Sequence, residues 1–435
     1  MRRFRVSKSE AEIGRCLRKV VITAAKMDPS YRRFLGSNGI KPDMIRSAES
    51  LSKLPITSKM TMLPGLARAR RTSRRHRRRI VRSATSGTSG QVLLVGMSLP
   101  EWWFRAYSYF RCMTRHARLS WPLTIAHIGS VSLEPMAPRT SRSWVYPVRV
   151  VRVPRLLRPS EQVDQLLASR VQVVSGHPTC LEAVARDLAS RGTAYKTRLI
   201  ACRGEILSAR TREALSRGFD GRIADYYNCE EIGNMAYECP ADPTRMHVNT
   251  DACWLEVVDG HGVPQEIGVE GDVVVTNLYN LTMPFVRYAL GDRATLLSHG
   301  GQPCACGSLA PTILAPAGRM DDYFVFPDGR RMSPRTVEGL VILPLLQHLR
   351  AESPDLLLSP KYQIVQESEE SIVLLVDAPL SFAKGLETEV VSAFRKRGFS
   401  VQLAIREISE IPLAASGKSK SVRSLLDTGE PHGMA

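Results

Sequence analysis

The chain has 435 residues, of which 43% are hydrophobic and 23% are charged, a composition typical of a folded protein with two or three domains. No apolar run is long enough to cross a membrane and no hydrophobic stretch follows the amino terminus, so we expect a cytoplasmic protein without a membrane partner. Sixty Lys and Arg residues against 42 Asp and Glu give a net charge of +18, which favours phosphates or acidic macromolecules as partners.

The amino-terminal part begins with a predicted helix over residues 6–26, followed by a proline-broken loop at 51–59. A dense arginine run then extends from Arg68 to Arg82. It has no interleaved aromatic residues, which argues against binding of single-stranded nucleic acid. The run is either a solvated surface or a docking strip for an acidic partner or a phosphate-rich substrate.

The next segment is rich in hydroxyl groups and glycine: Thr85, Ser86, Gly87, Thr88, Ser89 and Gly90. Glycine lets backbone N–H groups turn inward, and short hydroxyl side chains add donors, so such a loop can surround a polyphosphate. It lacks the lysine of a Walker loop. On its own, the pattern is more typical of a turn between two strands than of a phosphate loop.

The middle of the chain alternates strands, turns and helices. We expect an aromatic-rich helix over 100–118, strands at 171–174 and 199–202, and a helix from Thr179, its candidate cap, to 190. This order predicts α/β layers with ligand loops at the ends of the strands.

The remaining sequence is richer in strands. Residues 219–227, 254–259 and 272–277 predict an antiparallel region. Beyond residue 320, strands at 362–366, 371–376 and 401–405 and a helix at 386–397 predict a small α+β domain.

Five motifs occur in an ordered set: the Thr85–Gly90 loop, Tyr227–Gly233, Asn277–Asp292, Gly318–Asp322 and Pro412–Lys420. Together they resemble the adenylate-forming ligases, specifically the phenylacetate–CoA ligase-like branch, over residues 54 to 425. The resemblance implies an α/β, multi-sheet adenylation domain at 1–318 and a small mobile α+β lid domain at 319–435. A hinge at 319–322 would join them.

The resemblance also implies a two-step reaction. A carboxylic acid, by default an aryl or arylacetic acid, attacks the α-phosphate of ATP to give acyl-AMP, and CoA then takes the acyl group. An acidic carrier protein or an amine are alternative acceptors. A degenerate ligase fold that binds acidic partners, with nucleic acid an unfavoured case, is the alternative from another functional class.

Residue roles follow from the same resemblance. The Thr85–Gly90 loop would hold the phosphates, Glu231 would bind Mg²⁺, and Lys418 would stabilise charge on the forming acyl-adenylate. Tyr227 would flank adenine and contribute to the acid pocket with Gly204 and Glu205. Asp292 would bind the ribose, Arg319 the ribose or phosphate, and Asp321 would be the hinge.

Some of these assignments have plainer alternatives. Glu231 could be an acidic residue at the start of a helix, and Lys418 could belong to a solvated basic tail. The chain also departs from the family at Gln91, where a lysine is usual, and at Asn228, where glycine is usual. These departures concern the phosphate loop and the acid pocket.

Four residues have the types and spacing of a zinc site: Cys239, His247, Cys304 and Cys306. Thiolate and imidazole are preferred Zn²⁺ ligands, and four of them close a tetrahedral structural site. Some members of the resembled branch carry a similar set. The alternative is three buried thiols and a loop histidine, since the nine cysteines form no disulfide framework.

Overall fold

The computed structural model describes residues 10–41, 44–45, 47, 49–58, 80–84, 93–120, 122–130, 148–154, 157–205, 207, 209–314, 324–332, 334–352, 362–377, 383, 385–409 and 422–426. Its helices are α1 (Glu10–Met27), α2 (Pro29–Ser37), the 3₁₀ helix η2 (Glu49–Lys53), α4 (Leu99–Met113), α5 (Pro159–Leu167), α6 (Pro178–Ser190), α7 (Ala209–Gly218), α8 (Pro334–Glu352) and α9 (Leu386–Arg395). None of these helices has the length and apolar character needed to span a membrane.

The strands are β1 (Ile80–Ala84), β2 (Leu94–Ser98), β3 (Leu123–Ser130), β4 (Val148–Pro154), β5 (Val173–Gly176), β6 (Tyr195–Arg203), β7 (Phe219–Cys229), β8 (Gly233–Cys239), β9 (Asp242–Val248), β10 (Cys253–Val258), β11 (Glu270–Asn277), β12 (Tyr288–Ser298), β13 (Thr312–Leu314), β14 (Phe324–Val325), β15 (Arg331–Met332), β16 (Tyr362–Gln366), β17 (Ser371–Val376), β18 (Gln402–Glu407) and β19 (Val422–Ser424).

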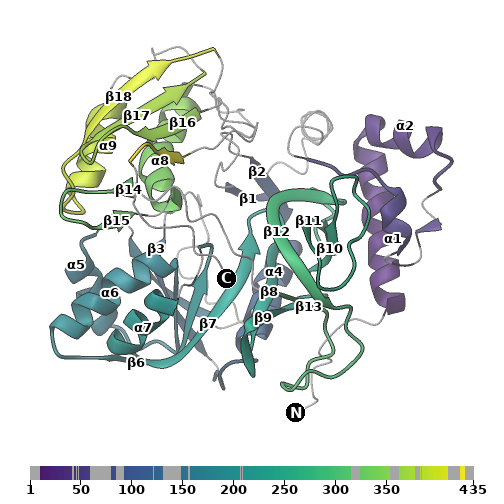
Figure 1. Ribbon diagram of the computed structural model, residues 1–435, viewed down its shortest axis with the longest axis horizontal. Helices are drawn as coiled ribbons and strands as arrows, with labels where there is room; N and C mark the ends of the chain where they lie inside the picture. Colours follow the sequence, from purple (N-terminus) through teal and green to yellow (C-terminus); the bar gives the residue numbers. More distant parts are fainter. Residues whose placement is uncertain are drawn as a thin grey trace.

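A sheet of 11 strands, in the order β10-β11-β12-β13-β9-β8-β7-β6-β5-β3-β4, dominates the amino-terminal part (Figure 1). Strands β7, β6, β5, β3 and β4 run parallel, whereas β7 pairs with β8 in the antiparallel sense. Strand β7 therefore joins a parallel half to an antiparallel half. Open α/β sheets bind ligands beyond the carboxyl ends of their parallel strands, and β7 is one of these strands.

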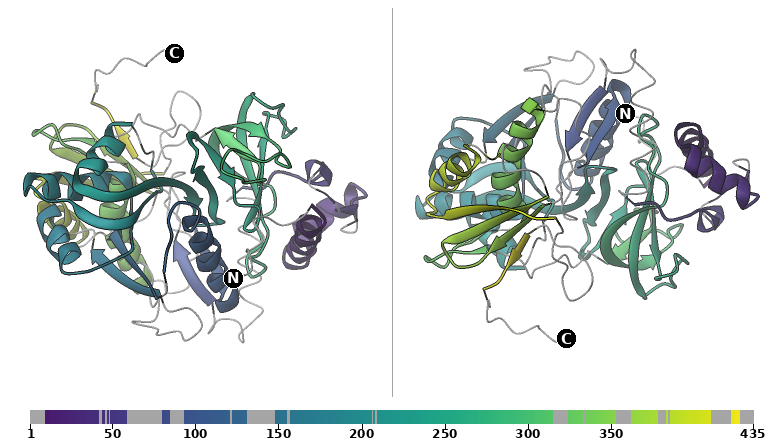
Figure 2. Two further views of the ribbon diagram at one scale, coloured as in Figure 1. Left: turned by 90° about the horizontal axis from the view of Figure 1, so that it is seen from below. Right: turned by 90° about the horizontal axis from the view of Figure 1, so that it is seen from above.

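Helices cover both faces of the parallel half. One face packs against α5, α6 and α7 through a core that includes Val174, Leu181 and Ile200, and the other packs against α4 through Cys112, Val173 and Leu199. The strands are apolar on both faces because both are covered, so they read in the sequence as continuous hydrophobic runs. Helices α1 and α2 lie at the opposite end, beyond the antiparallel half (Figures 1 and 2).

The carboxyl-terminal part has a four-stranded sheet, β18-β17-β16-β19, packed against α8 and α9. Its core runs from Phe324 to Val422 and includes no residue of the amino-terminal part. Both views of Figure 2 place this sheet on the side of α5–α7. The expected α/β class and the smaller second sheet are confirmed.

Several sequence expectations differ locally. Thr179 is not the cap of α6: His177 occupies that position in an extended conformation and Pro178 opens the helix. Proline fits there because it lacks an N–H that the first turn leaves unpaired in any case. Helix α4 ends at Met113 rather than at 118, and β5 lies two residues later than expected.

Several predicted functional residues lie outside the described residues: Thr85–Gly90, Gln91, Arg319, Asp321, Lys418 and the arginine run up to Arg79. The boundary at 318/319 and the hinge at 319–322 also lie there and stay predictions. The backbone on either side of the loop is described. Strands β1 and β2 form an antiparallel hairpin in which Ala84 pairs with Leu94, so the loop connects two strands of one hairpin.

Candidate active site

The candidate site gathers at the carboxyl end of β7, where the sheet changes from parallel to antiparallel pairing. Tyr227 is two residues before the end of this strand. Its hydroxyl donates a hydrogen bond of 2.7 Å to Oδ2 of Asp292 on β12. Burial and the neighbouring Asp292 carboxylate raise the pKa of Tyr227, so the phenol stays protonated as the donor. Two residues of separate motifs, 65 positions apart, are thus in direct contact.

Glu231 lies in the turn between β7 and β8, beside Tyr227 in the sequence. Its side chain is buried, and Oε1 accepts a hydrogen bond of 3.1 Å from the Tyr288 hydroxyl. Strand β8, not a helix, follows this turn, so the alternative explanation of Glu231 as a residue favoured by a helix dipole is wrong. Burial of the Glu231 carboxylate at the end of β7 therefore has another explanation, and binding of a cation is one that fits a buried charge.

The turn that carries Glu231 is held from outside. Arg105 of α4 donates to the Glu230 carbonyl and to its carboxylate, both at 2.9 Å, and Tyr279 donates to the Ile232 carbonyl at 2.8 Å. Gly233 closes the turn with φ of +94°, and a Cβ there would lie 3.2 Å from Arg105 and from the Tyr279 hydroxyl. Glycine is required by both the backbone conformation and the space.

Helix α4 also fixes a second loop of the site. Glu101 accepts hydrogen bonds from the backbone N–H of Ser98, Leu281 and Thr282 at 2.6, 2.8 and 3.0 Å. The Asn277–Asp292 motif therefore starts from a loop tied to the helix that follows the β1–β2 hairpin. This ties the end of β2 that is remote from the candidate phosphate loop to residues 281–282 of the motif that carries Asp292.

Arg287, next to Tyr288, has a structural role. It is 2% exposed and contacts the Glu256 carboxylate at 3.1 Å and the carbonyls of Leu54 and Gly262, each at 2.7 Å. Its φ of +43° is rare for a residue with a side chain, and these contacts maintain it. Arg287 fixes the segment 52–57 against the β-rich region.

Gly204 and Glu205 follow β6 at the same edge of the parallel sheet. Gly204 has φ of +78°, as a sharp exit from a strand requires. Oε2 of Glu205 accepts hydrogen bonds from the N–H and hydroxyl of Thr179, at 3.1 and 2.7 Å. The Glu205 carboxylate is thus bound to the first turn of α6. Thr179 donates to Glu205 instead of capping the helix.

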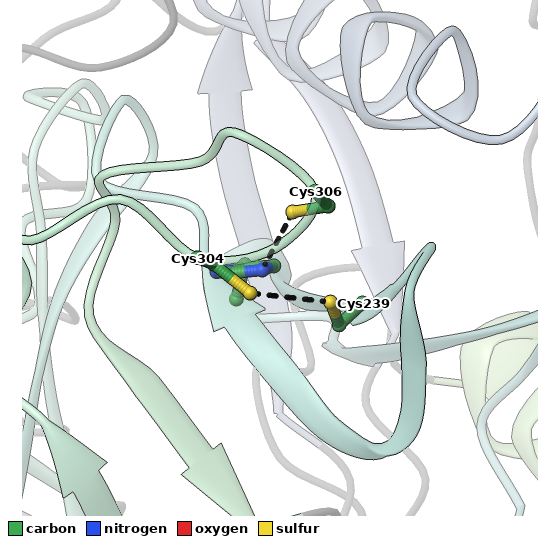
Figure 3. A group of neighbouring side chains, drawn as sticks. Cys239, Cys304 and Cys306 are labelled. Carbon is green, nitrogen blue, oxygen red and sulfur yellow. Dashed lines mark hydrogen bonds between the residues drawn. The ribbon is translucent and has the colours of Figure 1, made fainter.

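The four candidate zinc ligands come together. One ligand atom from each of Cys239, His247, Cys304 and Cys306 lies within 4.8 Å of all the others. The Sγ atoms of Cys239 and Cys304 are 3.6 Å apart, and Cys306 Sγ is 3.2 Å from His247 Nε2. Figure 3 shows the three thiols turned toward one another. Ligands of tetrahedral zinc are separated by about 3.3–3.8 Å, so the cluster fits the ion.

Comparisons with known proteins were made by sequence and by structure. No protein-family model and no curated protein matches the sequence. Solved structures of a 2-hydroxyisobutyryl-CoA ligase match along nearly the whole chain. One, with 2-HIB-AMP and CoA in the thioesterification state, has a TM-score of 0.62 at 17% identity and covers 95% of this chain and 89% of that chain. Another, in the postadenylation state with R3-HIB-AMP, has a TM-score of 0.59 at 17% identity and covers 96% and 89%.

The chain shares the fold of this acyl-CoA ligase. Within this fold, Tyr227 contacts Asp292, and Tyr288 of the same strand as Asp292 contacts Glu231.

Four residues that support the candidate site were not predicted from the sequence. Glu101 and Arg105 were predicted only as part of the aromatic-rich helix at 100–118, and Tyr279 and Tyr288 were given no role. Their partners are 47 to 181 positions away, a separation that no local pattern encodes. The i, i+4 spacing of Glu101 and Arg105, two charged residues within an aromatic helix, was the available signal.

Proposed function

We propose that the protein uses ATP to convert a carboxylic acid into an acyl-adenylate and pyrophosphate, and then transfers the acyl group to the thiol of CoA. The observation that carries this proposal is the contact between Tyr227 and Asp292 beside the buried Glu231, in the fold of an acyl-CoA ligase. The matched ligase was solved with an acyl-AMP and CoA, which supports the same pair of half-reactions here.

In the proposed mechanism, Tyr227 flanks adenine and Asp292 accepts hydrogen bonds from the ribose hydroxyls. Asp292 is exposed, and the Tyr227 hydroxyl orients its Oδ2. A carboxylate already oriented by a phenol loses little freedom when it binds a sugar.

Glu231 is the residue that would hold Mg²⁺. Oxygen ligands suit this ion, and the buried carboxylate with a hydroxyl donor at Oε1 fits it. When bound, Mg²⁺ would supply positive charge to the phosphates. Tyr288 and Arg105 keep the carboxylate and its turn in place, and act as positioning residues.

Other roles rest on the sequence. We propose that Thr85–Gly90 hold the phosphates, that Lys418 stabilises charge on the reacting carboxylate, and that Arg319 contacts ribose or phosphate. The lid, residues 319–435, would turn about Asp321 between the half-reactions. Its separate core supports a unit that can move as a body.

We further propose that Cys239, His247, Cys304 and Cys306 hold a structural Zn²⁺, and that the enzyme works in the cytoplasm on an aryl or arylacetic acid. A carrier protein or amine acceptor and a degenerate binding module are the alternatives. The arginine run that motivates them lies mostly outside the described residues. Glu231, buried and hydrogen-bonded, supports an active ligase instead.

An acid-dependent exchange of labelled pyrophosphate into ATP tests the proposal. We expect exchange with at least one member of a broad panel of carboxylic acids, and its loss in Lys418→Ala. A product assay with CoA and with a carrier protein then identifies the acceptor. Absence of exchange with every acid, together with salt-sensitive binding of an acidic polymer, would support the binding module.

A further inference from the structure

Arg203 ends β6 at the edge of the sheet where the candidate site lies. Its register partner on β7 is Tyr226. Alternate residues of a strand share a face, and Leu199 and Ala201 belong to the core under α4, so Arg203 lies on the α4 face. Tyr226 belongs to that core as well, whereas Tyr227 packs with the core of the antiparallel half. Arg203 is therefore on the opposite side of β7 from the proposed adenine contact.

The guanidinium of Arg203 has a neutral partner. It donates a hydrogen bond of 3.2 Å to Nδ1 of His127, which lies within β3. No carboxylate within the described ranges forms an ion pair with Arg203, and the nearby Glu205 is bound to Thr179. The cation is partly buried without a counter-charge from this part of the chain.

His127 adds a second donor to the same place. Burial, and then the charges of Arg203 and Arg152, lower its pKa to about 3. The imidazole is thus neutral at physiological pH. Because Nδ1 accepts from Arg203, the proton resides on Nε2, which is a donor.

Two hydroxyl groups complete the cluster. Tyr109 of α4 and Ser175 of β5 place their oxygens 3.5 Å apart, a weak contact that leaves donor capacity for a ligand. Burial raises the pKa of Tyr109, and the Arg203 charge opposes this effect. We term the group of donors around the Arg203 guanidinium the Arg203 cluster. It consists of Arg203, His127, Tyr109 and Ser175.

Resting on the proposed function, we infer that the acid substrate carries a second carboxylate, which pairs with Arg203 in the Arg203 cluster. A guanidinium matches a carboxylate in charge and geometry, and a partly buried cation without a counter-ion favours an anionic ligand. Since the cluster and Tyr227 lie on opposite sides of β7, the cluster would contact the far end of the acid rather than the nucleotide. The substrate class is a dicarboxylic acid, on a ring or on a short chain.

The test uses pyrophosphate exchange with matched acids that differ only at the far end, which is a carboxylate, a carboxamide or a methyl group. The wild-type protein should prefer the carboxylate by about 10- to 100-fold in kcat/KM, the range expected for a hydrogen bond to a charged group. Arg203→Met should remove this preference, Arg203→Lys should keep part of it, and the KM for ATP should be unchanged in both.

Arg198→Met is the matched control, because Arg198 lies on the same strand and is exposed at its other end. It should retain the preference. Equal rates with methyl- and carboxylate-ended acids in the wild-type protein would overturn the inference while leaving the proposed function intact, as would equal rates with carboxamides. A raised KM for ATP in Arg203→Met would assign the arginine to phosphate instead. Absence of exchange with any acid would contradict the proposed function itself.

Discussion

Glu231 shows how single side chains make the proposed site. Its carboxylate is buried, which disfavours the charged form, and the Tyr288 hydroxyl offsets part of that cost. Burial and the Glu231 charge raise the pKa of Tyr288, so the phenol stays a donor at any physiological pH. The Tyr288 hydroxyl therefore holds the Glu231 carboxylate in a fixed orientation that suits it to bind a cation.

Glu231→Gln removes the charge and keeps the shape. We expect the rate of pyrophosphate exchange to fall by about 10²–10³-fold, the usual loss when one electrostatic contact to a transition state is removed. Tyr288→Phe should cost less and should raise the Mg²⁺ concentration at half-maximal rate, which a purely structural role would not do. Glu266→Gln, in an exposed turn, is the control. Exchange at the wild-type rate in Glu231→Gln would exclude the assigned role.

Asp225 of β7 makes a prediction about pH. Burial, and then the charge of Glu238, raise the pKa of Asp225 from 3.8 to about 7. Folding therefore favours the protonated acid, so the contribution of Asp225 to stability is complete below pH 3.8 and is lost as the pH rises to about 7. The loss is at most about 1.4 kcal/mol per pH unit.

Asp225→Asn should remove this pH dependence, so that the variant gains stability relative to the wild-type protein between pH 5 and pH 8. The comparison is made by denaturant unfolding at the two pH values. Asp220→Asn, an exposed carboxylate on the same strand, should behave as the wild-type protein at both. A constant difference between Asp225→Asn and wild type across this range would contradict the assignment.

At the scale of elements, α4 holds two loops of the candidate site, and the Cys/His cluster would hold another region once it binds the proposed zinc. Helix α4 binds the Glu230–Gly233 turn through Arg105 and the 281–282 loop through Glu101. The cluster lies at the other end of β8 and β9 and includes the connection from β12 to β13. The helix thus fixes the turn that carries Glu231, and the proposed zinc would fix the connection that follows β12, the strand of Asp292.

We expect about one equivalent of zinc in protein purified without chelator, and a lower Tm after its removal, because a structural metal contributes directly to folding. Cys306→Ser should lose the metal. Cys16→Ser, a thiol of α1 outside the cluster, should retain it. Metal-free protein whose three cluster thiols react freely in the native state would show that the cluster binds no zinc.

Local patterns predicted the elements better than their contacts. Apolar runs and glycine turns predicted the α/β order and the second α+β unit, because burial on both faces of a sheet leaves a clear signal. The proline at 178 was the signal that α6 begins there, and Thr179 was misread because its partner, Glu205, is 26 positions away. Arg105 and Arg203 act across the fold, so their roles depend on strand register that the sequence alone does not display.

At the scale of the whole molecule, two units with separate cores and a strongly basic surface suit anionic substrates. The core from Phe324 to Val422 contains no residue of the amino-terminal part, which suits the proposed mobile lid. A net charge of +18 would attract the proposed substrates, ATP, CoA and a dianionic acid.

The central claim is that a carboxylate oxygen attacks the α-phosphorus of ATP. An acid labelled with heavy oxygen in its carboxylate tests this most directly, with CoA present and the released AMP analysed by mass spectrometry. AMP should carry one labelled oxygen from the acid, and Lys418→Ala should yield no labelled AMP. Unlabelled AMP, or release of ADP in its place, would contradict it.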